Sequence, residues 1–301
     1  MSGVELRRAV GGLGRTLIAA GVLILLFVVY QLFGTNIAEA RSQTSLRKQF
    51  QKVLAGPQAT GATPVTVDPN SIPPTAPEGD GIAIIKIPKL GVEKVVVEGV
   101  GVDDLKKGPG HYPGTPLPGQ QGNASIAGHR TTYGAPFFRL NELNPGDTIF
   151  VTTRQGQFQY QVHDVHVVAP DDTGVLKPTP DNRLTLTTCN PRFSATQRLV
   201  LVAGLQGTAA APTPAPVASS PGTLPGDQQS PAIQTAGLSG ASKARTPAVL
   251  WGLAAAAVWL GAWLVGRAWR RWPAYFMGTP VFLVVLYAFF ENFSRLLPAN
   301  Y

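Results

Sequence analysis

An uninterrupted apolar run near the start of the chain constrains its fold more than any other feature. Residues 16 to 33 read TLIAAGVLILLFVVYQLF, 18 residues without a charged side chain. A helix of that length extends about 27 Å at ~1.5 Å per residue, close to the hydrocarbon thickness of a bilayer. We therefore expect a transmembrane helix at 16–33. The alternative is a cleaved signal peptide, because arginines precede the run and Ala38-Glu39-Ala40 resembles a small-residue cleavage site.

Two further apolar runs close the chain, at residues 247–266 and 273–290, and they predict a helical hairpin. Pro280 interrupts the second run, for which the alternative is a re-entrant or interfacial segment. Three arginines and two tryptophans lie in the connection at 267–272, which predicts a cytoplasmic loop with interfacial anchors. Residues 34–246 would then lie outside the cell. Basic residues between 41 and 52 favour the opposite orientation.

Pro, Gly, Thr and Ala concentrate in two low-complexity stretches, which divide the 301 residues. Residues 57–80 and 206–246 lack the apolar content that would compensate for chain ordering, so we expect linkers there. Between them about 125 residues are enough for one core. The expected segments are a cytoplasmic N-terminus (1–15), a membrane helix (16–33), stalk and linker (34–79), a folded middle domain (80–206), linker (207–246), a membrane helix (247–266), a cytoplasmic loop (267–272), a third membrane helix (273–290) and a tail (291–301).

The formal charge of +8 does not indicate a nucleic-acid binder. Residues 81–207 carry 12 Lys/Arg and 10 Asp/Glu, and no basic run interleaved with aromatics occurs there. The largest excess lies in residues 208–301, with 6 Lys/Arg against 2 Asp/Glu. We therefore interpret the basic composition mainly as a signal of membrane topology, and expect no nucleic-acid partner.

The middle segment has the sequence pattern of an all-β domain. Short β-branched runs, several of them alternating, are bounded by Gly, Pro, Asn and Asp, which predicts strands and a closed or nearly closed barrel. Only 103–107 and 136–142 resemble helical turns, so a parallel sheet has no source of crossover helices. The expected strands cover 81–87, 92–100, 124–129, 147–153, 157–169, 183–189 and 198–204.

Three residues of this segment are candidates for chemistry. Cys189 ends the run TLTTC and is the only cysteine, which excludes a disulfide framework and a Cys-based zinc site. His129 ends the run SIAGH, and an imidazole can transfer protons near neutral pH. Arg198 opens the next run, nine residues after the cysteine, so a hairpin would put its guanidinium beside the thiol. Taken singly, each is as readily explained as a core cysteine, a structural histidine and a surface arginine.

The order of these residues resembles the signature of the sortases, membrane-anchored cysteine transpeptidases with a TLxTC motif, an upstream His and a downstream Arg. The matching segments are GHRTTYGAPFFRL (128–140), LTLTTCNP (184–191) and ATQRLVLVA (195–203). HYPGT (111–115) followed by GHRTTYGAPF is most similar to class E sortases of high-GC Gram-positive bacteria. The resemblance covers residues 80–205 and departs from many family members in the C-terminal linker and hairpin.

The resemblance implies an eight-stranded β-barrel and a cysteine transpeptidase. Cys189 would attack the Thr carbonyl of an LAxTG- or LPxTG-like sorting signal on a secreted protein and form a thioacyl intermediate. His129 would act as general acid and base, and Arg198 would hold the substrate and the oxyanion. Tyr112 would contribute to signal choice, and Thr188 would line the oxyanion site. The acceptor would be a peptidoglycan precursor amine, and no cofactor is implied.

Other functions remain open from the sequence. A pilin-polymerising sortase would use a Lys of another subunit as acceptor, and an L,D-transpeptidase would need a His-Gly-Cys pattern that is absent. A non-catalytic, membrane-tethered binding module would bury Cys189 as an inert thiol. His111 is a rival base, although its loop context favours a structural contact.

No metal site is expected. His163 and His166 are three apart in an extended run and so do not form a helical pair. We interpret Asp171, Asp172 and Asp181, in the loop before the cysteine strand, as a solvated acidic turn; the alternative is the calcium site that some sortases have near such a loop. Residues 69–77 are a spacer or a lid over the site, and the sequence does not decide between these.

Overall fold

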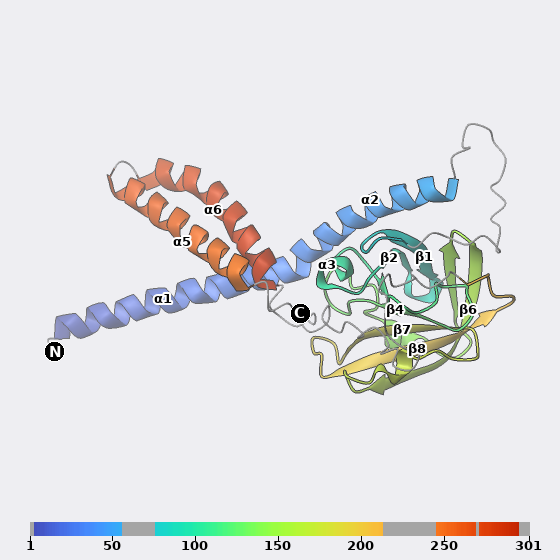
Figure 1. Cartoon of the computed structure of the whole chain (residues 1–301). Coiled ribbons are helices and arrows are strands. Elements are labelled where there is room, and N and C mark those ends of the chain that lie inside the picture. The colour runs from blue at the N-terminus through green and yellow to red at the C-terminus, as the bar shows by residue number, and fades with distance from the viewer. Residues whose placement is uncertain (1–2, 56–75, 213–244, 269–270, 295–301) are drawn as a thin grey trace, which may run out of the picture. The chain divides into compact units, whose positions relative to one another are not determined.

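The computed structural model describes residues 3–55, 76–212, 245–268 and 271–294 (Figure 1). The chain divides into two compact units, one comprising Met1–Thr35 and Lys243–Ser294 and the other Asn36–Ser242 and Arg295–Tyr301. The first unit is helical and the second holds the β-domain. Most of the two expected linkers, at 57–80 and 207–246, lies outside the described residues, as does most of residues 69–77, for which the sequence left a spacer and a lid open.

Within the described parts of the chain, three helical segments are long and apolar enough to cross a membrane: Val10–Ala55, Thr246–Ala268 and Tyr275–Ser294. In the first unit, α1 (Gly3–Val29) passes into a π-helical turn at Tyr30–Gly34, and α5 (Arg245–Ala268) and α6 (Arg271–Ser294) form the expected pair. Pro280 lies inside α6 without ending it. The orientation in the membrane stays a prediction.

The expected stalk is a helix that continues directly from the first apolar segment. α2 (Thr35–Ala55) begins where the π-helical turn ends, and Thr35 itself has helical φ and ψ. The side chains of Leu46 and Phe50 on α2 are buried, and Leu46 packs in a cluster with Val95 and Val97 of the β-domain. The stalk therefore packs on the β-domain along part of its length.

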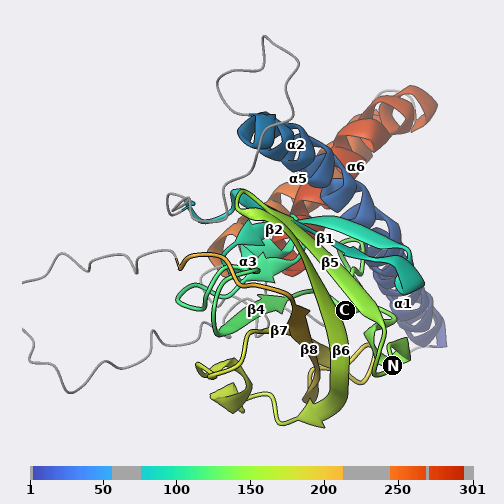
Figure 2. The ribbon, with the colours of Figure 1, turned by 90° about the vertical axis from the view of Figure 1, so that its right-hand side faces the viewer.

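Eight strands close into a barrel in the order β1-β2-β3-β4-β7-β8-β6-β5, which confirms the predicted fold class (Figure 2). All seven predicted strands form. The eighth, β3, has two residues and was not predicted from the sequence. The strands are β1 (Gly81–Ile87), β2 (Val92–Glu98), β3 (Gly110–His111), β4 (Asn123–Ala127), β5 (Thr148–Thr153), β6 (Gly156–Val168), β7 (Arg183–Asn190) and β8 (Gln197–Gln206).

Two parallel contacts in the barrel place the ends of strands that are distant in sequence side by side. β2 pairs in parallel with β3, and β4 pairs in parallel with β7, with Ala127 opposite Thr187. The remaining pairs are antiparallel, including β7 with β8. The chain leaving β4 therefore emerges next to the last residues of β7.

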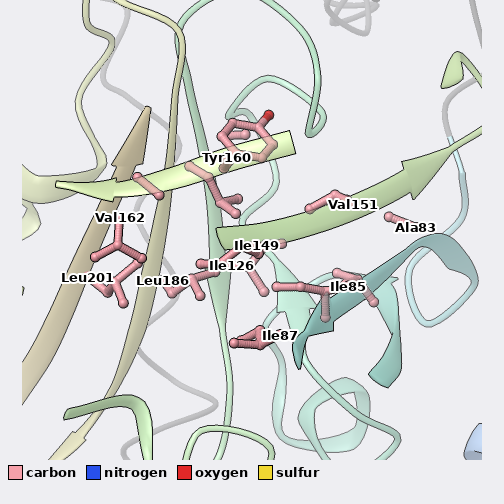
Figure 3. Close-up of a cluster of buried hydrophobic side chains, with 14 of the residues drawn as sticks. Ala83, Ile85, Ile87, Ile126, Ile149, Val151, Tyr160, Val162, Leu186 and Leu201 are labelled. Atoms are coloured by element: carbon pink, nitrogen blue, oxygen red, sulfur yellow. The ribbon is translucent and has the colours of Figure 1, made fainter. Parts of the chain in front are cut away.

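The barrel interior is filled by branched apolar side chains, which alternate with outward-facing residues along strands such as β5. Figure 3 shows Ile85, Ile126, Ile149, Leu186 and Leu201 pointing toward one another from five strands, and each is fully buried. Burying one such side chain stabilises the fold by about 1.5–3 kcal/mol. Packing continues beyond the last strand, where Ala210 is buried in the same core and its backbone N–H donates a hydrogen bond to the Gly119 carbonyl.

The helical turns expected at 103–107 and 136–142 are both present. They correspond to α3 (Val102–Leu105) and to a 3-10 turn at Leu140–Glu142. Two further 3-10 turns lie at Pro88–Leu90 and Thr173–Leu176. The helices of the β-domain between residues 76 and 212 are all short, so its core is made by the barrel.

Candidate active site

Cys189 and Arg198 lie opposite each other in the antiparallel pair β7–β8. The hairpin expected from their nine-residue spacing is therefore confirmed. Cys189 is not the last residue of its strand as expected, because pairing continues to Asn190 and Gln197. Its side chain is 2% exposed and packs in a cluster with Tyr112, Ala127 and Leu176. This small cluster, separate from the main core, surrounds the thiol with apolar groups from several elements.

Burial and two guanidinium groups act on the thiol in opposite directions. Removal from water raises the pKa of Cys189 above its usual value, whereas the charges of Arg198 and Arg130 lower it, and burial has the larger effect. The thiol is therefore mainly protonated at neutral pH in this structure. A group that accepts its proton when substrate arrives would increase its nucleophilicity.

Arg198 is held by two backbone carbonyl groups, one just before β8 and one at the first residue of β8. Its Nη1 donates to the carbonyl oxygens of Ala195 at 2.9 Å and of Gln197 at 3.0 Å, and the residue is 7% exposed. The guanidinium keeps further N–H donors on Nε and Nη2. Such a planar set of donors, fixed beside a nucleophile, suits an oxygen that becomes negatively charged during acyl transfer.

His129 lies two residues beyond the end of β4, so it is in a loop and does not end a strand as expected. Hydrogen bonds hold its neighbour Gly128 to the cysteine strand. The Gly128 N–H donates to the Thr187 carbonyl at 3.0 Å, and Thr188 Oγ1 donates to the Gly128 carbonyl at 2.7 Å. The imidazole is 3% exposed and lies 5.1 Å from the ring of Tyr133, centre to centre.

Arg130 is a residue of the site that sequence reasoning missed. Its Nη1 donates to the Cys189 carbonyl at 2.9 Å and to Asn190 Oδ1 at 2.6 Å, and its Nη2 donates to Asn141 Oδ1 at 2.9 Å. Its Nε is buried without a hydrogen-bond partner among the described residues. Burial lowers the pKa of this guanidinium. The only signal in the sequence was its position directly after His129.

The residues on both sides of His129 are thus bonded to the segment around Cys189. Gly128 contacts Thr187 and Thr188, and Arg130 contacts Cys189 itself. These bonds bring the histidine loop, the end of the cysteine strand and the start of the arginine strand to one place on the barrel. The grouping of His129, Cys189 and Arg198 expected from the sequence is a feature of this structure; their roles stay predictions.

Comparison with known proteins agrees with this arrangement. Residues 85–206 match the family model described as "Sortase domain". Sortase D of Bacillus subtilis is 32% identical over 177 residues, covering 58% of this chain and 86% of that protein. The chain belongs to the sortase family. Sortase SrtE1 of Streptomyces coelicolor is 36% identical over 205 residues, or 63% of this chain, and the expected resemblance to class E sortases is confirmed.

This sortase spans 55% of the length of Sortase SrtE1. Among solved structures, sortase E from Streptomyces avermitilis is 37% identical with a TM-score of 0.40, covering 46% of this chain and 93% of that one. A Clostridium perfringens Sortase D5 transpeptidase is 31% identical with a TM-score of 0.45, covering 56% and 99%. The family is one of cysteine transpeptidases, which agrees with the single cysteine of this chain.

Tyr112 and Thr188, the two expected substrate-binding residues of the sortase, both lie beside Cys189. The Tyr112 hydroxyl is 3.0 Å from Thr187 Oγ1, and burial raises the pKa of this phenol. Thr188 is fully buried and its hydroxyl is bonded to the Gly128 carbonyl. The role of Thr188 visible here is to tie the histidine loop to β7. The expected roles of both residues toward substrate stay predictions.

His111, the rival base, is bonded on both ring nitrogens. Its Nδ1 lies 2.8 Å from Glu98 Oε2, and its Nε2 lies 3.0 Å from the Pro116 carbonyl and from Thr115 Oγ1. With both nitrogens engaged and 2% of the residue exposed, His111 fixes the loop that carries Tyr112. The structural contact favoured by its sequence context is therefore present, but His111 lies in strand β3 and not in a loop as expected.

Two of the acidic residues before β7 bond to groups only two residues away in the sequence. Asp172 Oδ1 accepts from the Gly174 N–H at 2.9 Å, and Asp181 forms an ion pair with Arg183 at 2.6 Å. His166 Nδ1 lies 2.7 Å from Asp164 on the exposed side of β6. No group of three or more His, Cys, Asp or Glu side chains that could hold a metal ion occurs among the described residues.

Proposed function

We propose that this protein is a class E sortase that cleaves an LAxTG- or LPxTG-like sorting signal between Thr and Gly and joins the released acyl group to a peptidoglycan amine. The observation that carries the proposal is the pairing of Cys189 with Arg198 in a barrel that ties the His129 loop to the same strand end. A cysteine surrounded by two guanidinium groups and a histidine loop has the groups that acyl transfer requires.

In the first half-reaction, Cys189 Sγ attacks the carbonyl carbon of the signal's Thr, and the thiol proton passes to His129. The carbonyl oxygen becomes an oxyanion that accepts hydrogen bonds from Arg198. His129 then gives its proton to the departing Gly amine as the C–N bond breaks. The products are a thioester on Cys189 and a free amino terminus.

In the second half-reaction, an acceptor amine attacks the thioester carbon and gives a proton to His129. The C–S bond breaks, and the Cys189 sulfur recovers its proton as the new amide forms. Because burial raises the pKa of the thiol, the resting enzyme holds this proton and needs a bound substrate and a nearby base for attack. Protonated resting cysteine also limits side reactions with soluble electrophiles.

The apolar helices are evidence for a membrane-anchored enzyme. We propose that its barrel lies outside the cytoplasm. An N-terminal helix and a C-terminal hairpin would tether the barrel at both ends, near lipid-linked acceptor and unreleased substrate. A reporter fused after Tyr301 should lie outside the cell if all three segments span. Finding it in the cytoplasm would contradict three full spans. Unchanged substrate anchoring after deletion of residues 208–301 would contradict a role for the hairpin.

The test is mass spectrometry of the full chain in detergent micelles, incubated with LAxTG and LPxTG peptides and candidate amines. We expect cleavage after Thr, transfer to an amine and preference for LAxTG. Cys189→Ala is the control and should show neither product. Transfer only to a Lys side chain of a pilin-like peptide would favour a pilin polymerase instead. Absence of cleavage, with Cys189 unreactive toward iodoacetamide, would favour a binding module.

A further inference from the structure

The loop that carries His129 contains a stretch of backbone in an energetically unfavourable conformation. Tyr133, Gly134 and Ala135 have φ values of +49°, +74° and +41°, so two residues with side chains adopt the left-handed conformation. Such residues are uncommon there because Cβ approaches the following carbonyl. Conformations of this kind persist only where surrounding contacts determine them. The contacts that hold this stretch therefore also hold the catalytic loop.

Helix α2 supplies contacts to this stretch from almost 100 residues earlier in the chain. Asn36 Oδ1 accepts the Gly134 N–H at 2.9 Å. The Glu39 carboxylate packs directly against Gly134, since a Cβ built there would lie 2.5 Å from Glu39 Oε2. The other Glu39 oxygen accepts from Lys94 on β2 at 2.6 Å, and Glu39 is 1% exposed. One turn of α2 thus forms a wall and a hydrogen-bond acceptor for the loop.

α2 is itself fixed to the barrel by contacts that do not involve the loop. The Gln43 side-chain amide accepts from the Val95 N–H at 2.7 Å and donates to the Val95 carbonyl at 3.0 Å. It also donates to the Lys107 carbonyl at 2.8 Å, and Arg47 pairs with Glu93 at 2.6 Å. The helix is therefore a fixed support against which the loop can be positioned.

The stretch held by α2 is in contact with the imidazole. The Tyr133 ring lies 5.1 Å from the His129 ring with an interplanar angle of 34°, and both residues are buried. The Phe137 N–H donates to the His129 carbonyl at 3.2 Å, which closes the loop on itself. A shift of Gly134 is therefore transmitted through Tyr133 to His129.

We propose that α2 positions His129 for proton transfer, with Asn36 and Glu39 as positioning residues. This inference rests on the proposed function, because it assigns α2 to the acid–base step of that reaction. It makes the helix that continues from the first apolar segment a part of the active-site support, whereas Cys189 and Arg198 are held opposite each other by the pairing of β7 with β8. The acid–base step should then depend on α2, and thiol reactivity should not.

The test uses Asn36→Ala in the full chain in detergent micelles. A small displacement of a catalytic group lowers turnover strongly, so we expect kcat to fall about tenfold, with KM within about twofold of wild type. Turnover is expressed per Cys189 that iodoacetamide labels at the slow rate of the folded protein, which leaves out unfolded protein, whose exposed thiol reacts faster. The labelling rate of Cys189 should be unchanged, and the pH profile of kcat should shift.

Two further variants make the result specific. Asn36→Asp keeps an oxygen that accepts from Gly134 and should restore most of the turnover. Gln49→Ala removes an exposed amide from the same helix and should match wild type. A kcat for Asn36→Ala within twofold of wild type, or an equal loss in Asn36→Asp, would overturn the proposal.

Hydrogen exchange of residues 129–137, followed by mass spectrometry, separates failure of this inference from failure of the proposed function. In Asn36→Ala the Gly134 amide should exchange about tenfold faster, which requires no catalytic activity. Faster exchange in a chain that cleaves no peptide would reject the function and retain the support of the loop by α2. Unchanged exchange would reject the positioning role itself.

Discussion

Substitution of Gly134 by Ala tests how firmly α2 and the histidine loop are packed together. Gly134 has a φ of +74°, and an added Cβ would lie 2.5 Å from Oε2 and 2.6 Å from Cδ of Glu39. Gly91 provides a matched control, because its φ is +67° and a Cβ there meets nothing within 4 Å. The two substitutions therefore carry a similar backbone cost and differ in the contact with Glu39.

The expected difference follows from the bond that Glu39 must give up. An alanine in the left-handed region costs about 1–2 kcal/mol at either position. At Gly134 the carboxylate must also move away from Lys94, and a hydrogen bond between charged groups contributes about 1.5–3 kcal/mol. We expect Gly134→Ala to lower the free energy of unfolding by about 2.5–5 kcal/mol, and Gly91→Ala by about 1–2 kcal/mol.

The single buried cysteine gives the assay. A pulse of thiol reagent that is short against the labelling time of the folded protein, applied at increasing urea concentration, reports unfolding of the barrel, because Cys189 is 2% exposed and reacts slowly in the folded state. With a urea dependence of about 1–3 kcal/mol per molar, the midpoint for Gly134→Ala should lie about 1 M below that for Gly91→Ala. Equal midpoints for the two variants would refute the packing of Glu39 against the loop.

Three further predictions concern the site itself. Arg198→Lys should lower kcat/KM for an LAxTG peptide by about 100-fold, because an ammonium does not reproduce the planar donors, and near-wild-type activity would exclude the oxyanion role. Iodoacetamide alkylation of Cys189 should still rise above pH 9, because burial raises the pKa of this thiol and the thiolate forms only at higher pH; a plateau at about pH 8 would contradict this. Tyr112→Phe removes the hydrogen bond to Thr187, so it should lower the free energy of unfolding in urea by about 0.5–1.5 kcal/mol. The same substitution should reduce the preference for LAxTG over LPxTG, and an unchanged preference would exclude Tyr112 from signal choice.

The barrel was predictable because its strands carry strong local signals. Alternation of apolar and polar residues, with Gly and Pro at the ends, located seven strands to within a few residues. β3 was missed because a two-residue strand has no periodicity, and its pairing with β2 and β4 depends on where those strands lie. The pairing of Cys189 with Arg198 was predictable because a hairpin fixes register from loop length alone.

The contacts that hold the site residues in place were harder to predict from the sequence. Arg130 gave no signal beyond its position after His129, since its role depends on the parallel β4–β7 contact that brings it to the Cys189 carbonyl. The polar composition of α2 predicted a stalk, but Gln43 and Glu39 are polar residues buried by long-range bonds to β2. Such contacts depend on tertiary structure, and a polar helix pattern does not distinguish them from solvent exposure.

The most direct test of the account is intact-mass analysis of the full chain mixed with an LAxTG peptide and no acceptor amine. We expect a covalent adduct equal to the peptide's acyl portion up to Thr, located on Cys189 by fragmentation, and released by an added amine. Cys189→Ala should form no adduct, and His129→Ala should form and release it far more slowly. An adduct on another residue, or peptide cleavage by Cys189→Ala at the wild-type rate, would contradict the assignment of Cys189 as nucleophile.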